Sequence, residues 1–122
     1  MRTRPKDIGT RLETAVVRNA QDRGMVAERL AEGAANDRGD IRVYTDTEWV
    51  GEVKDRMSLN VPRALEKALA KSKTPDTFLV YRKMIRKAGN TNRTQDGPVV
   101  VVLTLDRFLG LLGESAGVGE DQ

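Results

Sequence analysis

The stretch GDIRVYTDTEWVGEVKDR, residues 39–56, decides how this chain is organised. Apolar and polar residues alternate on both sides of residues 45–47, which predicts two antiparallel strands joined by a turn. Side chains two apart in a strand share a face, so Glu52 and Lys54 should point the same way. In such a hairpin, Asp40 near the start of the first strand should lie close to Glu52 near the end of the second. The stretch predicts the centre of a sheet and a group of charges on it.

Working outward from this hairpin, the sequence predicts helices and strands in an order typical of an α/β fold. The expected elements are a helix over 7–23, a strand over 25–30, hairpin strands over 40–44 and 47–54, a helix over 60–73, a strand over 77–82, a strand over 98–105 and a helix over 106–113. A three-strand meander, a crossover helix and two more strands give a mixed β-sheet flanked by helices.

The C-terminal part of the sequence carries two further expectations. The apolar run of residues 98–105 is typical of a strand buried on both faces. Asp106 is the expected N-cap of the last helix. We expect one domain over residues 1–112, because 122 residues suffice for a single modest core, and a disordered tail over 113–122.

Composition limits the chemistry that is open to the protein. The chain has 39% hydrophobic and 32% charged residues, a net charge of +3, and neither cysteine nor histidine. This excludes disulfides, thiolate nucleophiles, the usual zinc ligands and a Ser-His-Asp triad. A metal would need carboxylate and carbonyl oxygens, which suit Mg²⁺ or Mn²⁺. No apolar run approaches the ~20 residues of a membrane span, and no signal peptide is visible. We therefore expect a soluble cytoplasmic protein with no membrane partner.

The strand charges suggest a metal site. Two neighbouring carboxylates repel each other unless a cation lies between them. Asp40, Glu52 and the backbone carbonyl of Val53 could supply oxygen ligands to a divalent ion, and Lys54 could orient a bound water or neutralise developing negative charge. Glu13 falls on the apolar arc of the first expected helix, where it could supply a third carboxylate.

These residues resemble the PD-(D/E)xK nuclease motif, with Gly39 in place of the proline before Asp40 and with Glu52-Val53-Lys54 as the second half. The segment IGTRLETAVV, residues 8–17, resembles the first helix of archaeal and phage Holliday-junction resolvases, and the likeness covers residues 8–56. It implies a restriction-endonuclease-like fold and a homodimer that cuts four-way DNA junctions with Mg²⁺, or with Mn²⁺ as a substitute, and without an organic cofactor. A phage member would work in the host cytoplasm.

By that resemblance, Glu13, Asp40 and Glu52 would be the metal-binding acids and Lys54 the catalytic lysine. Each of these charges also has a structural interpretation. Glu52 and Lys54 could be an exposed pair on an edge strand. The other open alternatives are an ion pair of Glu13 with Arg38 or Arg42, Asp37 as the ligand in place of Asp40, and a surface role for Glu66, which otherwise stays a reserve candidate.

Basic residues gather in the later part of the chain. The segment over 83–97 is polar and long for a connection in a compact domain, which favours a functional loop. The residues expected to contact DNA phosphates are Arg82, Lys83, Arg86 and Lys87, together with Arg4 and Lys6 of the N-terminal arm. Trp49 and Phe78 are interpreted as core residues rather than as platforms for stacked bases.

The sequence thus predicts an Mg²⁺-dependent, structure-selective DNA endonuclease, with a Holliday-junction resolvase as the leading interpretation. Three alternatives stay open. The first is a nuclease of the same fold that acts on flaps, nicks or other recombination and repair DNA. The second is a non-catalytic DNA-binding protein whose acids are structural. The third is a protein-interaction module with a charged surface.

Overall fold

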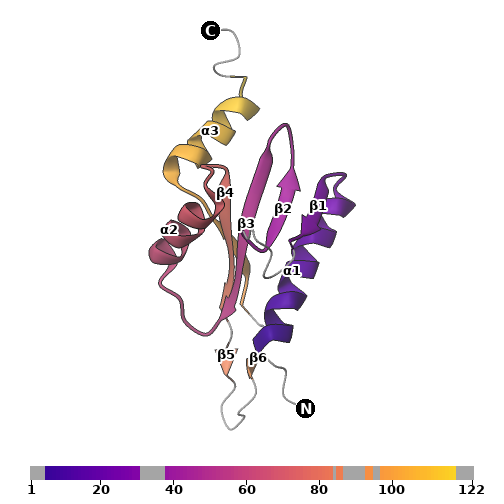
Figure 1. Ribbon diagram of the computed structural model, residues 1–122, viewed down its shortest axis with the longest axis vertical. Helices are drawn as coiled ribbons and strands as arrows, with labels where there is room; N and C mark the ends of the chain where they lie inside the picture. Colours follow the sequence, from indigo (N-terminus) through magenta and orange to yellow (C-terminus); the bar gives the residue numbers. More distant parts are fainter. Residues whose placement is uncertain (1–4, 31–37, 84, 87–92, 95–96, 118–122) are drawn as a thin grey trace.

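The computed structural model describes residues 5–30, 38–83, 85–86, 93–94 and 97–117, and every structural statement below concerns these residues (Figure 1). The elements follow in the order α1 (Pro5–Asp22), β1 (Val26–Arg29), β2 (Ile41–Tyr44), β3 (Glu48–Arg56), α2 (Val61–Ser72), β4 (Thr77–Lys83), β5 (Ile85–Arg86), β6 (Arg93–Thr94), β7 (Val99–Val102) and α3 (Leu105–Ser115).

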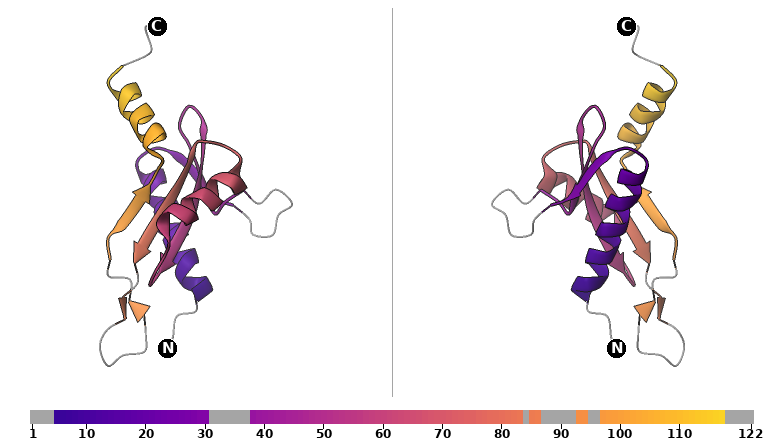
Figure 2. Two further views of the ribbon diagram at one scale, coloured as in Figure 1. Left: turned by 90° about the vertical axis from the view of Figure 1, so that its left-hand side faces the viewer. Right: turned by 90° about the vertical axis from the view of Figure 1, so that its right-hand side faces the viewer.

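Five of the strands form one mixed sheet in the order β1-β2-β3-β4-β7. The strands β1, β2 and β3 make an antiparallel meander, β4 runs parallel to β3 after the crossover through α2, and β7 returns antiparallel to β4. The helices α1 and α2 cover opposite faces of this sheet, as the two side views show (Figure 2). The expected α/β class, with a mixed sheet flanked by helices, is confirmed.

The face under α1 carries the larger apolar cluster. Leu12 and Val17 of α1 pack there against Ile41, Val53 and Val80 of the sheet, and all five are buried. Trp49 is also buried, and its ring lies 6.5 Å from that of Phe78, so both aromatic residues belong to the core as expected. The face under α2 holds a second cluster in which Leu79 contacts Ala64 and Leu65.

The crossover helix α2 begins and ends as its sequence indicates. Asn60 is the N-cap, and its side-chain oxygen accepts a hydrogen bond from the backbone N–H of Arg63 at 3.2 Å. The helix closes at Lys73, whose φ of 60° lies in the left-handed region and whose N–H donates to the carbonyl of Leu69. These two caps fix the length of the helix that lies over β3 and β4.

The C-terminal part differs from the prediction in three respects. The strand β7 is not buried on both faces: it is an edge strand, and Val101 is 60% exposed, because α1 packs on β1, β2 and β3. The last helix is capped by Thr104 rather than by Asp106. It extends to Ser115, so the first three residues of the tail expected over 113–122 are helical.

Two further features concern the expected loop and the helices. Within the segment expected as a loop over 83–97, β5 and β6 form a short antiparallel hairpin. Of the helices in the described part of the chain, none combines the length and the apolar character that crossing a membrane requires.

Candidate metal and nucleic-acid site

The structure brings Asp40 and Glu52 together on the α2 face of the sheet. The β2–β3 register pairs Ile41 with Gly51, which sets Asp40 opposite Glu52. Glu52 is also the register partner of Leu79, which packs against α2, so its side chain lies on that face. The two carboxyl groups are close enough to share a hydrogen bond. The proximity predicted from the hairpin is confirmed.

The pair has an unusual protonation state. Glu52 is 8% exposed, and burial is the main cause that raises its pKa from 4.5 to about 7. The negative charge of Asp40 and the hydrogen bond between the two carboxyl groups raise this pKa further, whereas Lys71 and Lys54 lower it. Near neutral pH, Glu52 is therefore partly protonated, and its proton lies between the two carboxyl groups. A divalent cation could replace that proton.

Asp40 is held where the sheet opens. Beyond Gly51, β3 no longer pairs with β2, which leaves the N–H of Val53 without a main-chain acceptor on that side. The Asp40 carboxylate takes this place, and its Oδ2 accepts the Val53 N–H at 2.8 Å. Because the N–H and C=O of one strand residue point to the same edge, the carbonyl of Val53 also faces the side of Asp40.

The glycine before Asp40 is required by packing. A Cβ at position 39 would lie 2.6 Å from Cγ1 of Val50 and 3.1 Å from the carbonyl oxygen of Gly51. Val50 is buried and the Gly51 carbonyl is main chain, so neither atom can move away cheaply. A glycine at position 39 therefore follows from how closely this segment approaches β3.

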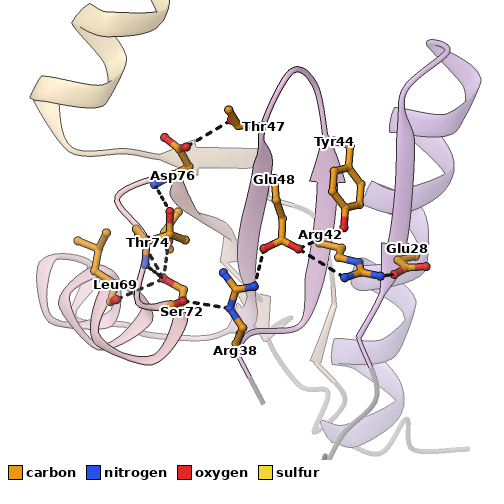
Figure 3. Close-up of polar contacts among 11 residues, drawn as sticks. Glu28, Arg38, Arg42, Tyr44, Thr47, Glu48, Leu69, Ser72, Thr74 and Asp76 are labelled. Atoms are coloured by element: carbon orange, nitrogen blue, oxygen red, sulfur yellow. Dashed lines mark hydrogen bonds and ion pairs between the residues drawn. The ribbon is translucent and has the colours of Figure 1, made fainter. Parts of the chain in front are cut away.

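A polar network that sequence reasoning missed ties the segment before Asp40 to the rest of the fold (Figure 3). The Arg38 guanidinium pairs with Glu48 at 2.5 Å, and its Nε donates to the carbonyl of Ser72 at the end of α2 at 3.1 Å. Glu48 in turn accepts from Arg42, which also pairs with Glu28 of β1. Side chains on β1, β2 and β3, together with a main-chain carbonyl at the end of α2, thereby fix the chain two residues before Asp40.

Two lysines contact Glu52, one at each carboxylate oxygen. Lys54 Nζ lies 3.8 Å from Oε1, as expected for neighbours on one strand face. Lys71 Nζ, from the last turn of α2, lies 3.7 Å from Oε2. Lys71 is not among the residues expected from the sequence at the metal site. Its signal in the sequence is weak, because only the crossover geometry brings the C-terminal turn of α2 beside β3.

Glu13 is placed differently from the other three candidates. It is buried as predicted, but α1 covers the opposite face of the sheet, and Glu13 Oε2 lies 3.7 Å from Arg29 Nη2 of β1. The alternative partners Arg38 and Arg42 both pair with Glu48, and Arg42 pairs also with Glu28. No group of three or more acidic residues that could hold a metal is present in the described part of the chain. Among the described residues, the structure brings two carboxylates together, those of Asp40 and Glu52.

The residues expected to contact DNA lie in different settings in the structure. Arg82 is engaged within the fold, because its Nη2 bonds the buried Asp55 carboxylate at 2.9 Å and its side chain is 17% exposed. Lys83 is exposed at the end of β4. Glu66 is exposed on α2 and does not line the site. The remaining candidates fall where the structure describes no side chain: Arg4, Lys6, Asp37, Arg86 and Lys87.

A cleft lies between β3 and α2, and Glu52 is its acidic residue. It has a volume of about 610 Å³ and is open because α2 turns the small side chains of Ala64 and Ala68 toward it. Five basic residues line it together with Glu52, two from β3 and three from α2: Lys54, Arg56, Arg63, Lys67 and Lys71. This lining suits a polyanion that approaches the Asp40–Glu52 pair.

Comparison with known proteins adds no relative to this picture. The chain matches no protein-family model, no curated protein sequence and no solved structure.

Proposed function

We propose that this protein is an Mg²⁺-dependent endonuclease for branched DNA, specifically a Holliday-junction resolvase with a restriction-endonuclease-like fold. One observation carries the proposal. The carboxyl groups of Asp40 and Glu52 lie together at the opening of the sheet, with the pKa of Glu52 raised to about 7, beside a cleft lined by basic side chains. Paired acids cost stability unless a cation relieves them, and a basic cleft beside them suits a phosphodiester.

The donor atoms fit magnesium. The available ligands are the carboxylates of Asp40 and Glu52 and the carbonyl of Val53, all of them oxygen. Mg²⁺ prefers a few protein oxygens and keeps several waters, so two carboxylates and one carbonyl suffice for it. Once bound, such an ion lowers the pKa of a coordinated water and stabilises negative charge on a phosphoryl oxygen.

The side chains of the protein supply the rest of the chemistry. The bond from the Val53 N–H fixes the orientation of the Asp40 carboxylate, so this ligand is positioned before any ion arrives. Lys54 lies on the same strand face as Glu52 and stabilises the negative charge that develops on the phosphorus-bound oxygens. Neither role requires a covalent enzyme intermediate.

A junction presents two strands to be cut, which favours a protein with two sites. The surface of β7 and α3 supports a homodimer. The two elements expose Val99, Val100, Val101, Leu105, Phe108, Leu109, Leu111 and Leu112, and none of the residues of α3 is buried. Consecutive valines of β7 point to opposite faces of the sheet, and the five residues of α3 make up most of this set. Exposed apolar surface of this kind marks protein interfaces. A second copy that packs on it would shield these side chains from water.

Cleavage of a panel of labelled substrates tests the proposal. We expect magnesium-dependent, paired nicks in a synthetic four-way junction and little cutting of flaps or linear duplex. If linear duplex is cut as readily as the junction, the protein is a nuclease but not a resolvase. Cutting of flaps in preference to junctions would assign the protein to another step of recombination or repair.

The basic cleft favours a second candidate, a DNA-binding protein that does not cut. It predicts tight, salt-dependent binding of the same junction without nicks at any concentration of Mg²⁺ or Mn²⁺. The two candidates also differ in Glu52→Gln. If Glu52 has only a structural role, this substitution should destabilise the fold, whereas a metal ligand should lose cleavage and keep a stable fold.

A further inference from the structure

The helix α2 carries three basic residues at a spacing of four. Arg63, Lys67 and Lys71 all line the cleft, and each is exposed. Residues four apart lie one above the other on a helix face, with a rise of about 6 Å between them. This rise is close to the separation of successive phosphates along one nucleic-acid strand. The three cations thus form a row that runs along the cleft.

Nothing in the described part of the chain neutralises the outer two members of this row. Arg63 and Lys67 form no ion pair with any acidic residue that the structure describes, and Glu52 is the sole acid in the lining of the cleft. The third member, Lys71, contacts Glu52 at 3.7 Å. The row therefore begins with two cations that are unpaired among the described residues, Arg63 and Lys67, and ends with Lys71 beside the Asp40–Glu52 pair.

The opposite wall adds to this charge. Lys54 and Arg56 enter the cleft from β3, two residues apart on one strand face. The cleft is consequently lined by cations on both walls, and Lys71 of α2 lies 3.7 Å from Glu52 of β3. Positive side chains on facing walls suit a strand whose phosphates are accessible from both sides.

We propose that Arg63, Lys67 and Lys71 bind successive phosphates of one nucleic-acid strand and lead that strand along α2 to the Asp40–Glu52 pair. The inference deepens the proposed nuclease function, on which it rests for the position of the cut. Binding of the strand along α2 does not itself require cleavage, so the two statements can be tested apart. Arg63 and Lys67 are not among the basic residues expected from the sequence alone to contact DNA.

The test uses the full chain with a double substitution, Arg63→Gln and Lys67→Gln. Both residues are exposed, and glutamine keeps the helix propensity of α2, so the fold should be retained. Lys71 is left intact because it contacts Glu52. The matched control is Arg11→Gln with Arg18→Gln, which removes two exposed charges from α1 on the other face of the sheet. The two variants have equal net charge.

Binding of a fluorescent four-way junction and of a single strand is measured in EDTA by anisotropy, between about 50 and 200 mM salt. We expect the α2 variant to lose at least about tenfold in affinity near 100 mM salt, and the slope of log K against log salt to flatten by about 1.5 to 2. The control should stay within about twofold of the parent.

Two results would overturn the inference: equal losses in the α1 and α2 variants, which would reflect net charge alone, or an α2 variant that binds like the parent. The proposed function is judged separately by cleavage in Mg²⁺. If the α2 row binds but no divalent ion supports nicking, the inference stands and the nuclease fails. If the parent cuts and the α2 variant cuts and binds equally well, the nuclease stands and the inference fails.

Discussion

Replacing Glu52 by glutamine should stabilise the metal-free protein at alkaline pH. In the folded state, burial and the neighbouring Asp40 raise the pKa of Glu52 to about 7, whereas its ordinary value is 4.5. Ionisation of Glu52 is therefore disfavoured in the fold and easy in the unfolded chain. Glutamine has the shape of the protonated acid and cannot ionise, so it removes this penalty.

The pH window follows from the two values. Below about pH 4.5 the residue is protonated in both states and contributes no penalty. Between 4.5 and 7 the unfolded state binds fewer protons than the folded one, so the free energy of unfolding falls as pH rises. Above pH 7 the free energy of unfolding has lost a constant amount, roughly 3 kcal/mol for this difference in pKa. This is a large fraction of the stability of a small domain.

Urea unfolding in EDTA at about pH 4.5 and pH 8 measures the effect. We expect Glu52→Gln to match the parent at the lower pH and to exceed it by about 2 to 3 kcal/mol at the higher one. Glu66→Gln, an exposed substitution on α2, is the control and should show no such trend. Added Mg²⁺ should stabilise the parent and leave Glu52→Gln unchanged. A Glu52→Gln protein that is destabilised at both pH values would refute the reasoning and assign the carboxylate a structural role.

Four other substitutions separate the parts of the account. Lys54→Met should lower the nicking rate by about 100-fold without changing the Mg²⁺ concentration at half-maximal rate, because it removes charge stabilisation and not a ligand; kinetics over a magnesium series would show this. Glu13→Gln should keep metal-dependent nicking and lower stability by about 1 kcal/mol, since Glu13 pairs with Arg29 on the other face of the sheet; abolished nicking in a folded variant would return Glu13 to the metal site. Leu109→Asp should shift sedimentation from dimer to monomer, because Leu109 is 54% exposed on the apolar surface; an unchanged dimer would place the interface elsewhere. Ser72→Ala should lower the free energy of unfolding by about 1 to 2 kcal/mol, measured in urea, since it removes a buried hydroxyl that bonds the Thr77 hydroxyl at 2.5 Å; a loss near zero would contradict that.

The centre of the fold was predictable because its information is local. Alternation along the hairpin identifies the strand faces, and the turn length identifies the pairing, so the proximity of Asp40 to Glu52 follows without knowledge of the rest. The caps of α2 are equally local, since Asn60 and Pro62 stand at its start. These features need only neighbours within about a dozen residues.

Features that depend on layers of the fold were not predictable in the same way. The valine run of β7 has the apolar character of a buried strand, but no local pattern says which helix covers it. Arg82 reads as a phosphate contact, yet the parallel register sets it beside Asp55 of β3. Glu13 is anomalous in its helix, and only the tertiary fold shows that its partner is Arg29. Lys71 likewise needed the crossover geometry to come beside Glu52.

The central claim is that Asp40 and Glu52 hold a divalent ion against a phosphodiester. The most direct measurement is cleavage of a four-way junction by the parent, Asp40→Asn and Glu52→Gln, each in EDTA and over a range of Mg²⁺ concentrations, with folding and junction binding checked in parallel. We predict nicks only with the parent and only in Mg²⁺, while both variants stay folded and bind the junction. Tight binding by the parent without nicks under any divalent ion, or nicks that survive in both variants, would contradict the account.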